Sequence, residues 1–396
     1  MKELSKQTKV MDRRNGINGI IVASTGYLVI LFLPVLMGVL SEGLGLSASQ
    51  VGQLASMEST GLALATLLCS FVIKSLNFHV TVMVGVAITV LANLFSIGVN
   101  DFSILCAIRL LSGFGEGLLV AVGMTAIGMT TNSGRWFGFY VASAVVLQTF
   151  GLLVIVPLYE QWQLPGIFIL ISILYLIPLA VLRLLPTNSG AYTVDCGGAK
   201  NNVQPTGFLI LALVSSLFFY ISIGGVWAYI IFMGTDAGLA LGYTSQALAI
   251  SMVAGLLGGV IFAAIGRHGT SHRLLGVSIV IMIGCLWLLS NISGDVNYVV
   301  ILCVYCFFWS VISARLFAVI SDADHSGRFI SAAQTTLAAG FAAGPYLASL
   351  LVTDYGYPGI NIMGAVALVV CFVTVTPLAL FERQREAALP CVVSES

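Results

Sequence analysis

Long apolar stretches alternate along this chain with short polar loops, and only every second loop carries basic residues. Each stretch has about 19 to 27 predominantly apolar residues, enough to cross the ~30 Å hydrocarbon core of a bilayer as a helix. This pattern predicts an all-α membrane protein with twelve transmembrane helices. The predicted helices lie near residues 17–40, 50–73, 80–98, 102–124, 136–158, 164–182, 207–233, 245–265, 274–292, 298–319, 329–352 and 360–380.

The charges of the loops set the orientation of these helices. With both termini in the cytoplasm, fourteen of the sixteen Lys and Arg residues are cytoplasmic, as the positive-inside rule requires. They are Lys2, Lys6, Lys9, Arg13, Arg14, Lys74, Arg135, Arg183, Lys200, Arg267, Arg273, Arg328, Arg383 and Arg385. Each of the six outer loops instead carries one acid, namely Glu42, Asp101, Glu160, Asp236, Asp295 or Asp354. A missed helix would invert every later loop, so the charges support the count of twelve.

The composition excludes other classes of protein. Hydrophobic residues make up 59% of the chain and charged residues only 8%, whereas soluble domains carry about a quarter charged residues. A soluble globular protein is therefore excluded, and the net charge of zero gives no basis for nucleic-acid binding. We expect a multi-pass protein of the cell inner membrane that functions as a monomer. Neither a metal nor another cofactor is expected, because no helix carries a cluster of metal ligands.

An internal repeat divides the chain into two halves. The segment SGRWFGFYVASAVVLQTFGLLVIVPLYEQWQLPGI from Ser133 matches SGRFISAAQTTLAAGFAAGPYLASLLVTDYGYPGI from Ser326, at an offset of 193 residues. We expect one six-helix bundle over residues 1–186, a cytoplasmic linker over 187–206 and a second six-helix bundle over 207–396. Because each half has an even number of helices, the two bundles are predicted to be parallel repeats.

The fourth predicted helix contains the run RLLSGFGEG, in which Gly113 follows Arg109 by four residues and Gly115 and Gly117 continue the pattern. This run, together with the twelve helices, resembles the major facilitator superfamily of secondary transporters. The loop AAIGRHGTSHR also keeps a basic residue and a glycine of the signature loop of that family. The resemblance implies two bundles that rock about a midplane site, with helices one, four, seven and ten around the central pathway.

Four charged side chains fall inside the predicted spans: Glu58, Arg109, Glu116 and Arg315. An ionisable residue at membrane depth is a functional-site hypothesis. From the helix ends, Glu58 and Arg109 both lie ~10–12 Å below the outer surface, so we expect them to be able to pair, while Glu116 lies ~21 Å deep. Arg109 and Glu116 are two turns apart on one helix face, which the resemblance turns towards the pathway. Since two carboxylates compete for one Arg, at least one of them is expected to spend time without a charged partner, and its greater depth makes Glu116 the preferred candidate for carrying a proton.

Each of these assignments has a structural alternative. Arg109 and one carboxylate can instead form a permanent pair inside the first bundle. Arg315 lies near the inner end of the tenth helix, where its side chain can extend into the cytoplasm. The pair Gly224 and Gly225 in the seventh helix either permits bending at the substrate site or serves close helix packing.

Aromatic and amide side chains complete the candidate site, and they indicate an amphipathic cavity suited to an organic ion, unless the aromatic residues face lipid. The candidate residues are Tyr27, Gln148, Trp227, Tyr229, Tyr305, Trp309 and Gln334. We expect a proton-coupled secondary transporter of a small amphipathic or aromatic organic anion that works by alternating access. Symport is favoured, because the Gly-Pro pattern of similar drug antiporters is absent from the fifth helix. Its partners are then the small-molecule substrate, protons and the lipid bilayer.

Two alternatives remain open. The first is proton-driven efflux of drugs or amphipathic metabolites. The second, from a different class, is a membrane-embedded enzyme or a sensor, although no helix offers a nucleophile and base or a metal set at membrane depth. An ATP-driven pump is excluded, because the chain has no Gly-x-x-x-x-Gly-Lys-Ser/Thr run for binding a nucleotide.

Overall fold

The computed structural model describes residues 2–73, 75–130, 133–188, 206–269, 272–292, 294–323 and 328–388, and every element within them is a helix. The all-α class is therefore confirmed. In chain order the helices are α1 (Lys2–Gly26), α2 (Leu28–Leu44), α3 (Ala48–Val72), α4 (Phe78–Phe95), α5 (Phe102–Gly128), α6 (Ser133–Tyr175), α7 (Ile177–Ala180), the 3-10 helix η1 (Leu182–Leu184), α8 (Thr206–Asp236), α9 (Leu241–Gly269), α10 (His272–Leu289), α11 (Asp295–Ala323) and α12 (Arg328–Ala388).

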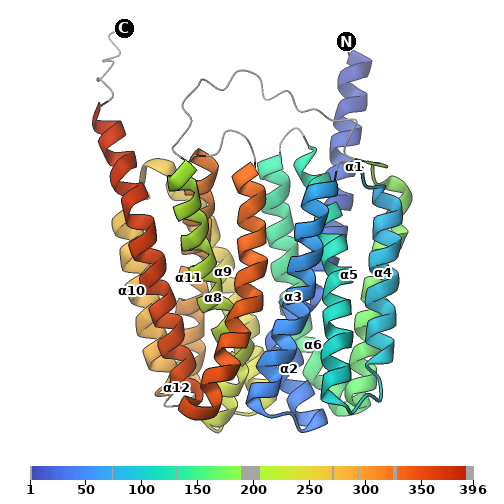
Figure 1. Ribbon diagram of the computed structural model, residues 1–396, viewed down its shortest axis with the longest axis vertical. Coiled ribbons are helices and arrows are strands. Elements are labelled where there is room, and N and C mark those ends of the chain that lie inside the picture. The colour runs from blue at the N-terminus through green and yellow to red at the C-terminus, as the bar shows by residue number, and fades with distance from the viewer. Residues whose placement is uncertain are drawn as a thin grey trace.

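Nine segments of the described chain are long and apolar enough to cross a membrane. Two of them turn back on themselves, because α6 is interrupted at Gln163 (φ 54°) and α12 at Gly356 (φ 61°). Figure 1 shows the two arms of α12 meeting at one end of the bundle. The shorter segment Leu274–Leu289 in α10 is also apolar. These helices coincide with the predicted stretches, while the count of twelve and the cytoplasmic position of the termini stay predictions.

The two bends fall at equivalent positions of the internal repeat. Gln163 and Gly356 are 193 residues apart, and each is followed two residues later by a proline, Pro165 or Pro358. A proline favours an extended conformation in the residue before it, so it helps to end one arm of the hairpin before the next begins. The repeat is thus visible in the backbone as well as in the sequence.

Local signals in the sequence account for the starts of the first-half helices. At the start of α3, the Ser47 side chain accepts a hydrogen bond from the Gln50 backbone N–H, and the Gln50 side-chain oxygen accepts one from the Ser47 backbone N–H. Asn77 and Asp101 accept hydrogen bonds from the first-turn amides of α4 and α5 in the same way. These caps satisfy amides that have no partner within the helix, and they fix where α3, α4 and α5 enter the bundle.

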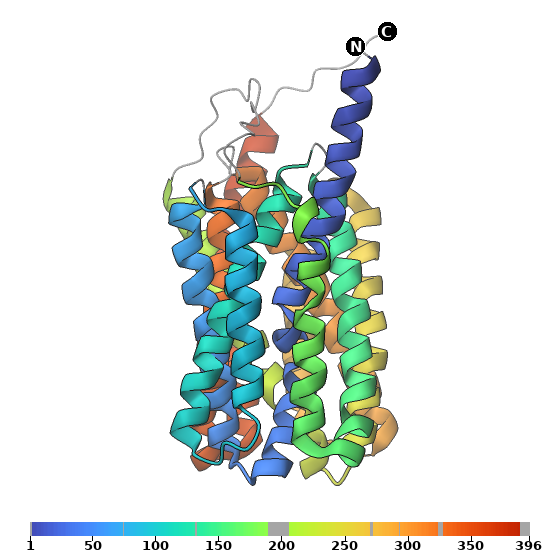
Figure 2. The same ribbon diagram turned by 90° about the vertical axis from the view of Figure 1, so that its right-hand side faces the viewer.

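The helices run side by side along one axis, and the start of α1 and the end of α12 lie at the same end of the bundle (Figure 1). Viewed from the side in Figure 2, the helices of the first half stand roughly parallel to one another. Within that half α5 packs against α1, α3 and α4, and within the second half α8 packs against α12 and α9 against α11. The halves meet where α3 contacts α12, α6 contacts α9 and α2 contacts α8.

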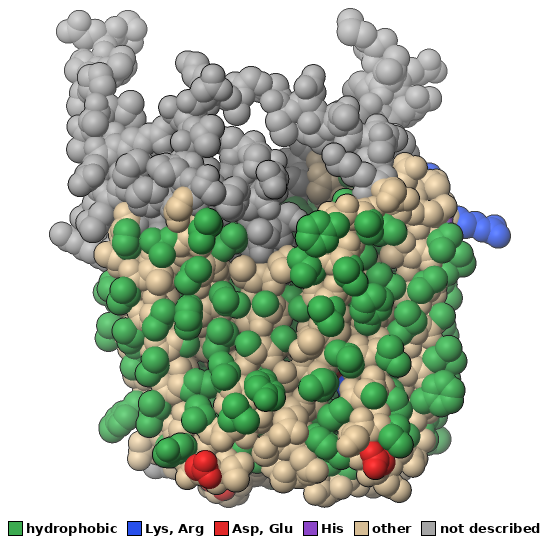
Figure 3. All heavy atoms as spheres, in the orientation of Figure 1, with side chains coloured by type: hydrophobic (Ala, Val, Ile, Leu, Met, Phe, Trp, Pro, Cys, Tyr) green, Lys and Arg blue, Asp and Glu red, His purple; other side chains and the backbone are tan. Residues whose placement is uncertain are grey.

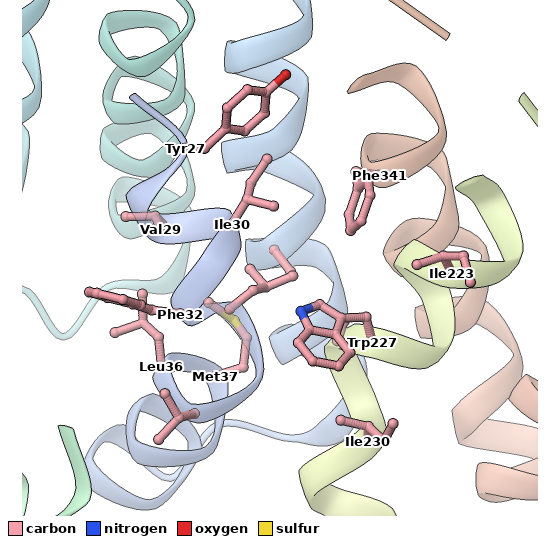
Figure 4. Packing of buried hydrophobic residues seen from close by; sticks show 14 of the residues in the cluster. Tyr27, Val29, Ile30, Phe32, Leu36, Met37, Ile223, Trp227, Ile230 and Phe341 are labelled. Atoms are coloured by element: carbon pink, nitrogen blue, oxygen red, sulfur yellow. The ribbon is translucent and has the colours of Figure 1, made fainter. Parts of the chain in front are cut away.

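The flank of the bundle is apolar. Figure 3 shows hydrophobic side chains scattered over the height of the visible face, with the acidic side chains gathered at one end. Large apolar side chains that are exposed on the described part of the bundle include Leu68, Phe71, Val146 and Trp287. Such a surface suits lipid, because all backbone polar groups of a helix are satisfied internally. The buried apolar side chains lie between the helices, and Figure 4 shows Trp227 pointing from α8 towards α2.

Candidate functional site

A buried charged cluster lies inside the first half, where Arg109 of α5 faces Glu58 of α3. The Nη1 group of Arg109 donates to Glu58 Oε1 at 3.3 Å and to Asn93 Oδ1 at 3.2 Å. Its Nη2 group donates to the Ala92 carbonyl at 3.3 Å and to Ser96 Oγ at 2.7 Å. The pairing that equal depth predicted is therefore present, and α4 together with Ser96, the residue that follows it, supplies three further acceptors.

The second carboxylate, Glu116, belongs to the same cluster. Ser112 Oγ donates to Glu116 Oε1 at 3.1 Å, and both carboxylates are almost fully buried. Neither Glu58 Oε2 nor Glu116 Oε2 has a hydrogen-bond partner within the described part of the chain. One guanidinium thus faces two carboxylates in a site without water access, and the three groups carry excess negative charge unless a proton is bound.

Glycines bring α3 and α5 close enough to form this cluster. A Cβ added at Gly113 would fall against the Glu58 carbonyl oxygen, and one at Gly61 would fall against the Leu110 carbonyl oxygen. Gly117 packs in the same way against Leu62. Small residues allow this approach of two membrane helices. Gly113 and Gly117 of RLLSGFGEG therefore serve the packing of α5 onto α3, whereas Gly115 packs against Gly85 and Thr89 of α4.

The orientation of α5 differs from the expected one. The resemblance placed Arg109 and Glu116 on a face towards the central pathway, whereas both side chains lie inside the first bundle. The physical reason is that the charged face of α5 is directed towards α3 and α4 by the same close packing, and that Phe168 of α6 covers the guanidinium, with its ring centre 5.4 Å from the Arg109 Cζ. The functional roles of Arg109, Glu58 and Glu116 stay predictions.

A cavity of about 540 Å³ lies between the two halves. It is lined by α6 of the first half and by α9 and α11 of the second, and two of the predicted residues, Gln148 and Trp309, belong to its lining. The Trp309 ring meets the Trp227 ring edge to face, with 5.3 Å between their centres. The lining residues are Gly138, Val141, Val145, Gln148, Met252, Gly255, Leu256, Gly259, Val260, Cys306, Trp309, Ser310, Ser313 and Ala314.

Three hydrogen bonds close the contact between the halves near the end where α2 joins α3. The Tyr229 hydroxyl donates to the Ala48 carbonyl at 2.8 Å. Ser56 Oγ donates to the Ala342 carbonyl at 2.7 Å, and Ser245 Oγ donates to the Leu152 carbonyl. We call this contact the outer seam. The cavity lies beyond it, because its lining residues belong to the parts of α6, α9 and α11 nearer the opposite end.

Of the remaining predicted residues, Tyr27, Tyr305 and Arg315 neither belong to the charged cluster nor line the cavity. Tyr27 is buried at the break between α1 and α2, with its ring centre 6.4 Å from that of Tyr140. Tyr305 is fully buried. Arg315 is partly buried and directly follows Ala314 of the cavity wall. The side chain of Gln334 lies outside the described residues.

Sequence reasoning missed the partners that α4 gives to Arg109. Asn93 and Ser96 are three residues apart, and therefore on one face, in the otherwise apolar run AITVLANLFSIG. A buried Arg needs several acceptors, so two polar side chains one turn apart at a similar depth were the available signal. The glycines of the cavity wall gave no comparable signal, because many glycines of this chain lie in helices.

The chain matches known proteins at the level of the fold. The family model described as Major Facilitator Superfamily matches residues 17–323. Crystal structures of the nucleoside transporter NupG are similar: a point mutant has a TM-score of 0.69 at 12% identity, covering 93% of this chain and 99% of that one. The other NupG structure has a TM-score of 0.68 at 15% identity, covering 93% and 98%. No match was found among curated proteins.

Proposed function

Because the chain belongs to the Major Facilitator Superfamily, we propose that it is a proton-coupled secondary transporter of an amphipathic organic solute, bound in the cavity between α6, α9 and α11. Membership makes the protein a multi-pass membrane transporter rather than an enzyme. The proposal adds the solute class, the coupling to protons, uptake by symport, action as a monomer and a place in the cell inner membrane.

The position of the cavity carries this proposal. Its walls come from both halves, and it lies on one side of the outer seam, which joins those halves by hydrogen bonds. A site shared by two bundles is exposed to alternate sides when the bundles rock about it. Trp309 gives the cavity an aromatic wall, while Gln148 and Ser310 give it polar groups. This combination suits a solute with an apolar or aromatic body and a few hydrogen-bonding groups.

If the solute is an anion, a cation other than Arg109 must bind its negative group. The Arg109 guanidinium is held by Glu58, Asn93 and Ser96 inside the first half, so we assign it to the coupling of protons. We propose that Arg315, which follows the cavity residue Ala314, meets the negative group of such a solute.

Nucleosides are the second candidate class of solute. The two similar crystal structures are of a nucleoside transporter. One observation favours the same class of solute here. The indole ring of Trp309, the amide of Gln148 and the serine hydroxyl groups line one cavity, and a flat base with an attached sugar would need such a set of groups. Proton-driven drug efflux is supported only by the shared fold.

Transport in proteoliposomes tests the proposal. We expect exchange of a labelled solute without ATP, and acidification of the lumen when an inward solute gradient is imposed on vesicles that contain a pH-sensitive dye. The panel comprises aromatic organic acids, nucleosides and amphipathic drugs, and empty liposomes serve as the control. Absence of exchange and of proton movement over the whole panel would contradict the proposal.

The Glu116→Gln variant tests the proton role. The amide keeps the shape of the side chain and the acceptor for Ser112 but cannot exchange a proton. We expect uptake to lose its dependence on the proton gradient while solute exchange and binding are retained. Glu42→Gln, at an exposed carboxylate near the end of α2, is the matched control and should keep full coupling. If uptake by Glu116→Gln still depends on the proton gradient, Glu116 does not carry the proton. That role then passes to Glu58, or neither carboxylate has it.

A further inference from the structure

Resting on the transport function proposed above, we propose that the solute enters the cavity as a flat ring whose edge pairs with the Gln148 amide, in a slot formed by Gly138 and Gly259. The solute class is thus a planar cyclic amide or heteroaromatic base, with a hydrogen-bond donor and an acceptor side by side on the ring.

The Gln148 amide is the first observation. Only 7% of this residue is exposed, and it lines the cavity. In the ranges that the structure describes, no hydrogen bond of its amide is found, and the amide atoms are not among the sealed, unpaired ones, so they are open to the cavity. A polar group that lines a cavity without a protein partner is available to a bound solute. An amide presents a donor and an acceptor next to each other, so it pairs in two places with a ring edge of the same pattern, as Gln does with adenine.

The shape of the cavity walls is the second observation. A Cβ built on Gly138 of α6 or on Gly259 of α9 meets no heavy atom within 4 Å, although both residues line the cavity. Gly255 is different, because its Cβ would meet the Cys306 carbonyl at 3.3 Å. Gly255 therefore serves packing, whereas Gly138 and Gly259 leave space open.

The two open glycines belong to helices from opposite halves. Since α6 and α9 pack against each other, bare backbone at these two positions leaves one stretch of cavity wall from each bundle without a side chain. These two stretches are the walls of the proposed slot. Trp309 of α11 lines the same cavity and supplies an aromatic surface on which a flat ring can stack. A volume of about 540 Å³ lies within the range of pockets that hold drug-sized molecules.

Binding to the purified full chain tests the edge recognition. The flat probes are 2-quinolinone and uridine, each compared with its N-methyl analogue, in which the ring donor is blocked. We expect binding of at least one probe, measured as a rise in melting temperature, and weakening by N-methylation of about tenfold to a hundredfold. Gln148→Leu should remove that difference. Gln53→Leu, which changes a partly buried glutamine of α3 outside the cavity, should retain it.

Two further measurements test whether the bound ring must be flat and whether the slot limits its thickness. Decahydroquinolin-2-one has the same amide edge on a puckered ring, so it should bind at least about tenfold more weakly than 2-quinolinone. Gly259→Val should raise the KM of the flat probe about tenfold or more, because the branched side chain would occupy the slot. Gly284→Val, at an exposed glycine of α10 that also has open space, should leave the KM unchanged.

The outcomes separate this inference from the transport function. Proton-linked uptake of other panel solutes, with no binding of either flat probe, would overturn the inference and leave the function standing. Equal binding of a flat probe and its N-methyl analogue would overturn the edge recognition, and an unchanged KM in Gly259→Val would overturn the slot. Binding of the flat probes without flux of any solute would contradict the transport function alone.

Discussion

Arg109→Gln is expected to reduce the amount of folded protein severely. The substitution leaves Glu58 and Glu116 buried without a cation, and removal of one partner from a buried ion pair costs about 3–5 kcal/mol. It also takes hydrogen bonds from Asn93 and Ser96. The measurement is the yield of monodisperse protein by size exclusion together with its melting temperature. Arg183→Gln, at an exposed arginine, is the control and should behave as the unchanged protein.

Two further variants show what the Arg109 cluster does. Arg109→Lys should also be impaired, because one ammonium cannot occupy the positions of both guanidinium nitrogens, which contact different acceptors. The double variant Arg109→Gln/Glu58→Gln should recover folded protein, since it removes a charge of each sign. If it also recovers proton-driven uptake, the pair is structural. If it folds but transports without coupling, the cluster carries the proton. A single Arg109→Gln as stable as the unchanged protein would contradict the buried pair itself.

Gly113→Ala is expected to give the second large effect. The new Cβ would overlap the Glu58 carbonyl oxygen, so α3 and α5 must separate. Overpacking of this kind typically costs about 1–3 kcal/mol, and here it would also displace the Glu58 side chain from Arg109. Gly128→Ala, on the same helix and with open space around its Cβ, is the matched control. Thermal unfolding in detergent should show a lower melting temperature for the first variant only, and equal melting temperatures would show that the two helices are not in close contact.

The sequence predicted the membrane class and the apolar segments because these depend on length and hydrophobicity, which are local properties. The repeat offset of 193 found in the sequence also relates the bends at Gln163 and Gly356 in the structure. Depth along a helix follows from the rise per residue, and it correctly placed Glu58 opposite Arg109. These features needed no knowledge of how the helices are rotated.

The rest of the candidate site depended on the rotation of each helix about its axis. A helix that is apolar on all sides gives no periodic signal for its inward face. For that reason Tyr229 was expected in the cavity but bonds to the Ala48 carbonyl at the outer seam, and Tyr305 is buried among other side chains. Gln148 and Trp309 do share a cavity, which only the packing of α6 against the second half makes visible.

The outer seam has one further property that bears on how the protein opens. All three of its hydrogen bonds run from a neutral side-chain hydroxyl to a main-chain carbonyl. Breaking these bonds separates no ions and only transfers each hydroxyl and carbonyl to water. The free energy of opening the seam should therefore depend little on salt concentration. The acceptors Ala48, Ala342 and Leu152 contribute no side-chain atom to these bonds. Substitution at those three positions therefore leaves the closure intact as long as the helix backbone keeps its place.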